Sequence, residues 1–338
     1  MKITALSETP AILEEFANLA GEVRKDPFRT GLLPAGVWKG FATMPTPFPK
    51  EFWVARSSDG RVIARVGASV SPVRAAEGAI GFFEADLAHR EGATAGYMLL
   101  AQAEDWLRSK GVTKAIGPMN FNTWFPYRFR VGAPAERFSW EPENPPQYVE
   151  IWEGAGYSDL EVYRSTGYEG LEEFTEHFWP SFEKAADLGF TFRPFDSSKV
   201  MEQEVPILYD ISMEGFREAF LFEPIPFAAF QVLYVPFAGK LDLGLSVIAS
   251  HGDHGPVGFF FAFQDRGYVV FKTIALKVST RGKGVSNAMM YLSAKAARDR
   301  GLKKLVTAMV KLGAQSESYG KKAKLLWENR YVLLKKDL

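Results

Sequence analysis

The sequence contains no cysteine among its 338 residues. That absence excludes disulfide bonds, thiolate metal sites and a cysteine nucleophile. The four histidines, at positions 89, 177, 251 and 254, are too few and too scattered for a zinc site, so we predict no bound metal. No window approaches about 20 uninterrupted apolar residues, and we predict no membrane span. The N-terminus carries acidic residues early and no apolar stretch typical of a signal peptide, so we expect a cytoplasmic protein.

Net charge is also absent, since Lys+Arg and Asp+Glu both count 40. No overall basic field favours nucleic acid, and no acidic excess favours a basic partner. The chain is 47% hydrophobic and its length suggests two domains. Its 28 phenylalanines predict a core packed with aromatic rings. Alternatively, some of them line an acyl or lipid pocket, and the loop expected at Phe222–Phe237 is the segment that suggests it.

The hydrophobic pattern predicts the same order of elements in both halves of an α/β chain: helix, loop, strand hairpin, strand, helix, strand, short helix, strand. In 103–116 and again in 294–306, an amphipathic helix ends at glycine and leads directly into a strand. This similarity indicates two copies of one domain, at 1–168 and 169–338, joined by a linker over 166–190. A proline-rich loop is expected at 26–50.

The chemically informative segment is the turn Arg281-Gly-Lys-Gly-Val-Ser286, which follows the long strand expected at 267–278 and opens a helix. Such a turn presents successive backbone N–H groups to an anion, and the helix N-terminus adds the positive end of its dipole. The two glycines permit close approach, and the basic side chains add charge. A diphosphate is the natural occupant. The turn has neither the dinucleotide spacing Gly-x-Gly-x-x-Gly nor the P-loop spacing. The alternative is a basic turn without a ligand.

In this position, Arg281-x-x-Gly284-x-Ser286 resembles the Arg/Gln-x-x-Gly-x-Gly/Ala motif of the GNAT N-acetyltransferase superfamily, with serine as the third small residue. The resemblance covers roughly residues 190–338. It implies two tandem GNAT-like domains, each a mixed, mostly antiparallel sheet flanked by helices. It also implies acetyl-CoA or another acyl-CoA as co-substrate, with no covalently bound cofactor. The residues that it assigns to the coenzyme are Thr273, Ile274, Ala275, Leu276, Val278, Arg281, Gly282, Lys283, Gly284, Val285 and Ser286.

The first half lacks this motif, because the glycines of its corresponding segment, Gly92 and Gly96, have the wrong spacing. Segments 81–84, 117–124 and 148–157 nevertheless resemble a group of tandem GNAT-like bacterial proteins. We therefore predict that the first copy has lost coenzyme binding and shapes the substrate cleft.

The resemblance further implies acyl transfer to an amine. The strand would pair with the pantetheine, and a backbone N–H near Ile274–Leu276 would bind the thioester carbonyl. Tyr319 is the candidate that protonates the leaving thiolate, or else a tyrosine packed on a helix face. Glu317 is a weaker candidate, whose alternative is a solvated helix charge. Glu84, in mid-strand, is a candidate base whose alternative is a solvent-facing side chain. Asn120 and Trp124 follow a strand end and are candidate substrate contacts, or else turn and core residues.

The leading hypothesis is thus an acyl-CoA-dependent N-acyltransferase acting on a small-molecule or lipid amine. One alternative is a Fem-like transferase that uses an aminoacyl-tRNA or lipid substrate, although zero net charge argues against extensive tRNA contacts. Another is a non-catalytic binding protein built from two decayed copies, against which the intact turn argues.

Overall fold

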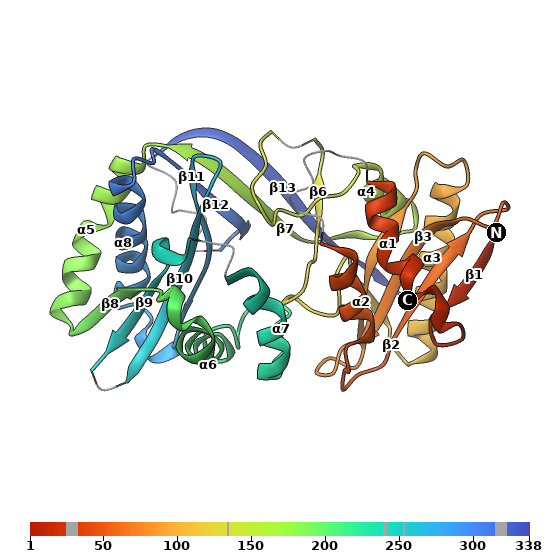
Figure 1. Cartoon of the computed structure of the whole chain (residues 1–338), viewed down its shortest axis with the longest axis horizontal. Coiled ribbons are helices and arrows are strands. Elements are labelled where there is room, and N and C mark those ends of the chain that lie inside the picture. The colour runs from red at the N-terminus through yellow and green to blue at the C-terminus, as the bar shows by residue number, and fades with distance from the viewer. Residues whose placement is uncertain (25–32, 134, 239–241, 253, 315–322) are drawn as a thin grey trace. The chain divides into compact units, whose positions relative to one another are not determined.

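The computed structural model describes residues 1–24, 33–133, 135–238, 242–252, 254–314 and 323–338. The chain divides into two compact units (Figure 1). Unit 1 comprises Met1–Val162 together with Arg330–Leu338, and unit 2 comprises Tyr163–Asn329.

Unit 1 contains a sheet with the strand order β1-β2-β3-β4-β5-β13, in which β4 and β5 are parallel and the other pairs are antiparallel. The short strand β6 also pairs with β13. The elements that lie in unit 1 or begin there are β1 (Lys2–Ala5), η1 (Pro10–Ile12), α1 (Leu13–Val23), α2 (Ala35–Thr43), β2 (Lys50–Arg56), β3 (Val62–Val70), β4 (Glu77–Ala85), α3 (Gly92–Ser109), β5 (Lys114–Gly117), β6 (Phe129–Val131), α4 (Gln147–Gly154) and β7 (Ser158–Glu169).

Unit 2 repeats the pattern with the order β7-β12-β11-β10-β9-β8, and its parallel pair is β11 with β12. The remaining elements are α5 (Leu171–Asp187), β8 (Phe190–Pro194), η2 (Ser197–Lys199), η3 (Val200–Glu204), α6 (Val205–Gly215), α7 (Phe227–Ala238), η4 (Leu243–Leu245), β9 (Val247–His251), β10 (Gly255–Asp265), β11 (Tyr268–Leu276), η5 (Val278–Thr280), α8 (Val285–Asp299), β12 (Lys304–Lys311) and β13 (Lys324–Asp337). The predicted fold class, a mixed and mostly antiparallel sheet flanked by helices in each of two copies, is confirmed.

The two copies match at the helix-to-strand step that the sequence comparison identified. Helix α3 is followed by Gly111 at φ +80°, and α8 by Gly301 at φ +83°. Both values lie in the left-handed region that glycine adopts at low cost, so each glycine stops its helix and turns the chain back to the sheet. The strands that follow, β5 and β12, then start their parallel pairing at Lys114 and Lys304.

Each sheet is covered on both faces. In unit 2, α5 and α8 pack on one face, where Phe260 and Val269 belong to a core shared with these helices. Helix α6 packs on the other face through Ile211, against Phe259 and Ala275 (Figure 1). Adjacent strand residues such as Phe259 and Phe260 join opposite cores because side chains alternate across a strand.

Three stretches predicted as irregular contain helices, and these predictions were wrong. The expected loop at 26–50 includes α2, whose apolar residues lie at helical spacing after Pro34. The expected linker at 166–190 includes α5, which buries Leu171, Phe174 and Phe178. The expected loop at Phe222–Phe237 includes α7, in which Phe230 is buried. In α2 and α5 the spacing of apolar side chains favours a helix, whereas α7 is apolar on nearly every side. The prolines stand before the helix or are accommodated within it.

The observed division of the chain differs from the predicted boundary at residues 168 and 169 in two ways. It falls inside β7 at Val162, and the last nine residues return to unit 1. There, Leu334 of β13 pairs with Gly117 of β5. Among the described residues, no helix has the length and apolarity that crossing a bilayer requires. The short helix predicted at 314–322 falls almost entirely outside the described residues.

Candidate coenzyme-binding site

The turn between β11 and α8 has the backbone geometry that an anion site needs. Gly282 has φ +77° and Gly284 has φ +83°, so both use the left-handed region. A Cβ added at Gly282 would meet no atom within 4 Å, which leaves this part of the turn open. Within the described part of the chain, the backbone N–H groups of residues 282–287 have no hydrogen-bond acceptor, and the first helical bond is Ala288 N–H to Gly284 O at 2.9 Å. Such unpaired donors at a helix N-terminus favour an anionic ligand.

The strand that leads to this turn, β11, is paired on only one side along its last residues, and we call this its one-sided edge. β11 pairs with β12 from Tyr268 to Phe271 only, whereas β12 continues alongside β7 as far as Lys311. On its other side, β11 stays paired with β10 up to Leu276. The four predicted strand residues Thr273, Ile274, Ala275 and Leu276 thus have a strand neighbour on one side alone within the described sheet. An extended ligand could complete the other side by β-augmentation.

The two basic side chains of the turn differ in their contacts. Arg281 Nη1 donates to Glu218 Oε2 at 2.7 Å, and Arg281 Nη2 donates to Gly215 O at 2.8 Å. Lys283 is exposed and makes no ion pair with any described residue. The N–H of Val278, another predicted coenzyme residue, donates to Glu214 Oε1 at 2.9 Å. The structure therefore gathers the predicted coenzyme residues in one place, Val285 and Ser286 included as the first residues of α8.

The corresponding turn of the first copy does not have this geometry. Helix α3 starts 15 positions after Glu77, whereas α8 starts 17 positions after Tyr268, the corresponding strand residue. No residue of 86–91 is a glycine, and a Cβ at Gly92 would lie 1.8 Å from the carbonyl oxygen of Asp86. Glu91, at the N-cap of α3, is held by the backbone N–H of Ser58 at 3.0 Å. A carboxylate and close backbone packing thus occupy the start of α3, where the second copy has an open glycine turn.

The strand edge of the first copy is covered by the chain itself. β4 pairs with β5 only from Glu77 to Ala79, and the next segment folds back onto β4. There, Met119 N–H donates to Ile80 O at 2.8 Å, and Phe82 N–H donates to Asn120 Oδ1 at 2.7 Å. A Cβ at Gly81 would lie 2.4 Å from that same Oδ1 atom.

We call residues 118–122, which fill this edge, the edge-filling segment. Asn120, predicted as a substrate contact, is buried within it and bonds the strand backbone. Trp124, the second predicted substrate contact, is half-buried, and its N–H donates to Asn122 Oδ1 at 3.1 Å. The geometry supports the structural alternative for Asn120, and no described contact assigns Trp124 to a ligand.

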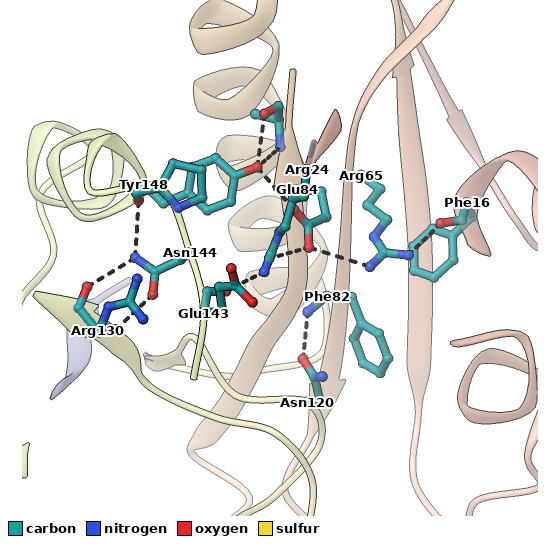
Figure 2. A network of polar contacts seen from close by, with 12 residues as sticks. Phe16, Arg24, Arg65, Phe82, Glu84, Asn120, Arg130, Glu143, Asn144 and Tyr148 are labelled. Atoms are coloured by element: carbon teal, nitrogen blue, oxygen red, sulfur yellow. Dashed lines mark hydrogen bonds and ion pairs between the residues drawn. The ribbon is translucent and has the colours of Figure 1, made fainter. Parts of the chain in front are cut away.

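Glu84, the predicted base, lies in a buried polar network (Figure 2). Its expected alternative, a solvent-facing position, is wrong, because its side chain is 2% exposed. Arg24 donates to both carboxylate oxygens, through Nε to Oε2 at 2.8 Å and through a second, shorter bond. The hydroxyl of Tyr148 donates to Glu84 Oε2 at 3.0 Å. With Arg65 Nη2 at 3.7 Å from Oε1, the carboxylate is surrounded by structural partners.

Sequence reasoning missed the arginines of this network, since the partners lie up to 64 residues from Glu84 along the chain. Arg65 is fully buried, donates to Phe16 O at 2.5 Å and stacks on the Trp38 ring at 4.6 Å. Its burial lowers the pKa of Arg65 to about 10, against the opposing effect of the Glu84 charge. Burial likewise raises the pKa of Tyr148 above its ordinary value. The only signal in the sequence is an arginine inside an apolar strand pattern.

The predicted acid Tyr319 and the weaker candidate Glu317 lie outside the described residues. Glu84 belongs to unit 1, and the turn at 281–286 belongs to unit 2. Over the described ranges, no group of three or more His, Asp or Glu side chains is placed to hold a metal ion.

Comparison with solved structures decides the fold. A tandem GNAT protein from the clavulanic acid biosynthesis pathway matches with a TM-score of 0.55 at 12% identity, over 99% of this chain and 98% of that chain. The chain has the tandem GNAT fold. A GCN5-related N-acetyltransferase from Sphaerobacter thermophilus matches with a TM-score of 0.51 at 16% identity, over 99% and 95% of the two chains.

A third structure is a probable N-acyltransferase of unknown function from Enterococcus faecalis. It matches with a TM-score of 0.57 at 9% identity, over 99% of this chain and 72% of that chain. No protein-family model matches the sequence, and no match is found among curated proteins.

Proposed function

We propose that unit 2 binds an acyl-CoA and transfers its acyl group to an amine. The observation that carries the proposal is the row of unpaired N–H groups over residues 282–287, which follows the one-sided edge of β11 after the short helix η5. A pyrophosphate matches the N–H groups, and an extended amide chain such as pantetheine matches the strand edge. Coenzyme A contains both a pyrophosphate and a pantetheine arm, and the two are joined in the same order as the N–H groups and the strand edge along the chain.

In the proposed reaction, the amine nitrogen attacks the carbonyl carbon of the thioester. The C–N bond forms, the C–S bond breaks, and coenzyme A leaves as a thiolate that takes up one proton. The proton lost by the amine passes to a carboxylate or to water. Backbone N–H groups near Ile274–Leu276 are the expected donors to the oxyanion. Tyr319 remains the predicted donor to the thiolate, and Glu84 is excluded from our mechanism because its partners hold it in a buried network.

The acyl chain and the acceptor are proposed only as classes. An acetyl group needs no large pocket. A longer acyl chain or a lipid amine would need an apolar surface, and α7 offers one, because no charged residue occurs between Phe227 and Ala238. Exposed Val232 and Tyr234 lie on this helix. The acceptor is therefore a small-molecule or lipid amine.

Isothermal titration with acetyl-CoA and with palmitoyl-CoA tests the proposal. We expect saturable binding, weakened about tenfold in Lys283→Glu because the new charge repels the pyrophosphate. Lys303→Glu is the matched control, since this exposed lysine precedes β12 at the opposite end of the parallel strands. Binding of palmitoyl-CoA alone would select a long-chain substrate. If neither ligand binds, coenzyme-dependent transfer is refuted, as a Fem-like enzyme or a decayed copy would predict.

A further inference from the structure

We call residues 281–286 the coenzyme turn. Helix α6 and the residues after it contact the chain at 277–281, where this turn begins, through a series of side chains. Asp210 Oδ2 lies 2.6 Å from Lys277 Nζ, and Glu214 Oε1 accepts the N–H of Val278 at 2.9 Å. Glu218, in the turn after α6, accepts a bond from Arg281. The three carboxylates are spaced four residues apart, so they follow one face of the helix and its extension. Their partners follow the chain in the same order.

Backbone contacts reinforce this row of carboxylates. A Cβ at Gly215 would lie 2.8 Å from the carbonyl oxygen of Leu276, so the end of α6 and the end of β11 meet backbone to backbone. Arg281 adds a bond to Gly215 O at 2.8 Å, where the guanidinium satisfies a carbonyl at the C-terminal end of α6. The base of the coenzyme turn is thus attached to α6 through both side chains and main chain.

The two basic side chains of the turn have different surroundings. The guanidinium of Arg281 is directed at α6 by two hydrogen bonds, whereas the ammonium of Lys283 is exposed with no ion pair to the described residues. The unpaired N–H groups begin immediately after Arg281, at Gly282. The attachment therefore stops where the proposed phosphate site starts, and it leaves the donors of that site free.

We propose that Asp210, Glu214 and Glu218 are positioning residues for the coenzyme turn, and that Arg281 supports coenzyme binding by holding the turn to α6. The inference rests on the proposed function of unit 2. A preset turn loses less conformational entropy when the ligand binds, so a bond that never touches the ligand still increases affinity. Exposed ion pairs contribute modestly, and the expected effect of each is correspondingly small.

The inference is tested by whether Glu218→Gln lowers or raises the affinity for coenzyme A. If Glu218 positions the turn, this variant binds coenzyme A about two- to fivefold more weakly than the wild type. If Arg281 instead binds the phosphates and Glu218 merely competes for it, the variant binds more tightly, and the inference is overturned. In the positioning case, Glu218→Gln adds no further loss to Arg281→Gln, because the guanidinium with which the Glu218 charge pairs is already absent.

Glu214 provides a second pair of variants. Glu214→Gln keeps an oxygen that can accept the Val278 N–H and should bind coenzyme A like the wild type, whereas Glu214→Ala should bind more weakly. Asp299→Asn removes an ion pair of unit 2 with Lys295 near the far end of α8, at 2.7 Å in the native chain, and serves as the matched control without effect. Equal affinity of Glu214→Ala and the wild type would contradict the positioning role.

A readout without ligand separates the two proposals. Amide hydrogen exchange at Thr280 and Arg281, whose N–H groups donate to Lys277 O and Val278 O, should be faster in Glu218→Gln and Glu214→Ala than in the wild type, in the absence of coenzyme A. If exchange is unchanged, the attachment to α6 does not order the turn, and the inference fails even though coenzyme A binds. If exchange rises but wild-type protein binds no coenzyme A, the proposed function fails instead.

Discussion

The charges in the buried network of unit 1 predict which of two variants, Glu84→Gln or Arg65→Met, destabilises the protein more. The size and burial of the two side chains alone would predict the opposite order. Arg24 and Arg65 carry two positive charges, and Glu84 between them carries one negative charge. Glu84→Gln would leave two buried cations without a counter-charge in direct contact. Arg65→Met would leave the single pair of Arg24 and Glu84, which keeps its two hydrogen bonds. We therefore expect Glu84→Gln to be more harmful than Arg65→Met, although Arg65 is larger and fully buried.

Breaking a buried ion pair by removing one partner costs about 3–5 kcal/mol, because the remaining charge is left without compensation. Since a folded domain is stable by only about 5–15 kcal/mol, Glu84→Gln should unfold unit 1 at a clearly lower denaturant concentration. Arg65→Met leaves Glu84 paired with Arg24, so no buried charge is left without compensation, and we expect the variant to lose less than about 2 kcal/mol. That loss reflects its bond to Phe16 O and its stacking on Trp38.

Guanidinium chloride unfolding, followed by tryptophan fluorescence and circular dichroism, measures both changes. Glu14→Gln is the matched control, because its ion pair with Lys39 in the same unit is exposed, at 65% and 40% of the two side chains, and should contribute less than about 1 kcal/mol. A loss below about 1 kcal/mol in Glu84→Gln, or a larger loss in Arg65→Met, would refute this account. A stable Glu84→Gln protein with lost transferase activity would instead restore Glu84 as the base.

Three further predictions follow from the two copies. Titration with coenzyme A should give about one site per chain, because the edge-filling segment and the short first turn close the other copy, and a stoichiometry near two would contradict this. Gly81→Ala should lower the free energy of unfolding by about 1–3 kcal/mol, since its Cβ would press on Asn120, whereas Gly21→Ala has open space and should not. Burial raises the pKa of Tyr148 above 10.0, so its contribution to stability is present below about pH 10 and is lost as the pH rises and the unfolded tyrosine ionises. Tyr148→Phe should therefore lose less stability than the wild type between about pH 9 and pH 11, and an equal loss would argue against this assignment.

The conformation of the turn at 281–286 could be predicted because everything that forms it is local. Gly282 and Gly284 allow the left-handed backbone, and a strand and a helix on either side direct the N–H groups to one point. The order of the elements and the duplication were also readable, since periodicity reports which side chains face a core. Helices α2 and α5 have this periodicity, but nearby prolines and aromatic residues are equally typical of loops. Helix α7 is apolar on nearly every side, so periodicity does not identify it.

The roles of single polar residues could not be predicted in this way. Glu84 has the sequence context of a candidate base, yet its partners include Arg24, 60 residues away, and Tyr148, 64 residues away. Asn120 follows a strand end, as ligand-binding residues often do, but it bonds the backbone of β4 in place of a ligand. Which hydrogen bond a side chain makes depends on what folding brings beside it, and this information is not present in its local sequence.

The sequence by itself determined that the chain consists of two α/β copies and that a turn with two glycines leads into helix α8 of the second copy, because backbone propensity and hydrophobic period act over a few neighbouring residues. Tertiary structure alone decided that the first copy closes its own strand edge, that Glu84 is neutralised within a buried network, and that α6 holds the coenzyme turn. It also returned residues 330–338 to unit 1. These outcomes depend on contacts between segments far apart in the chain, whose free energies are realised only when the whole fold is assembled.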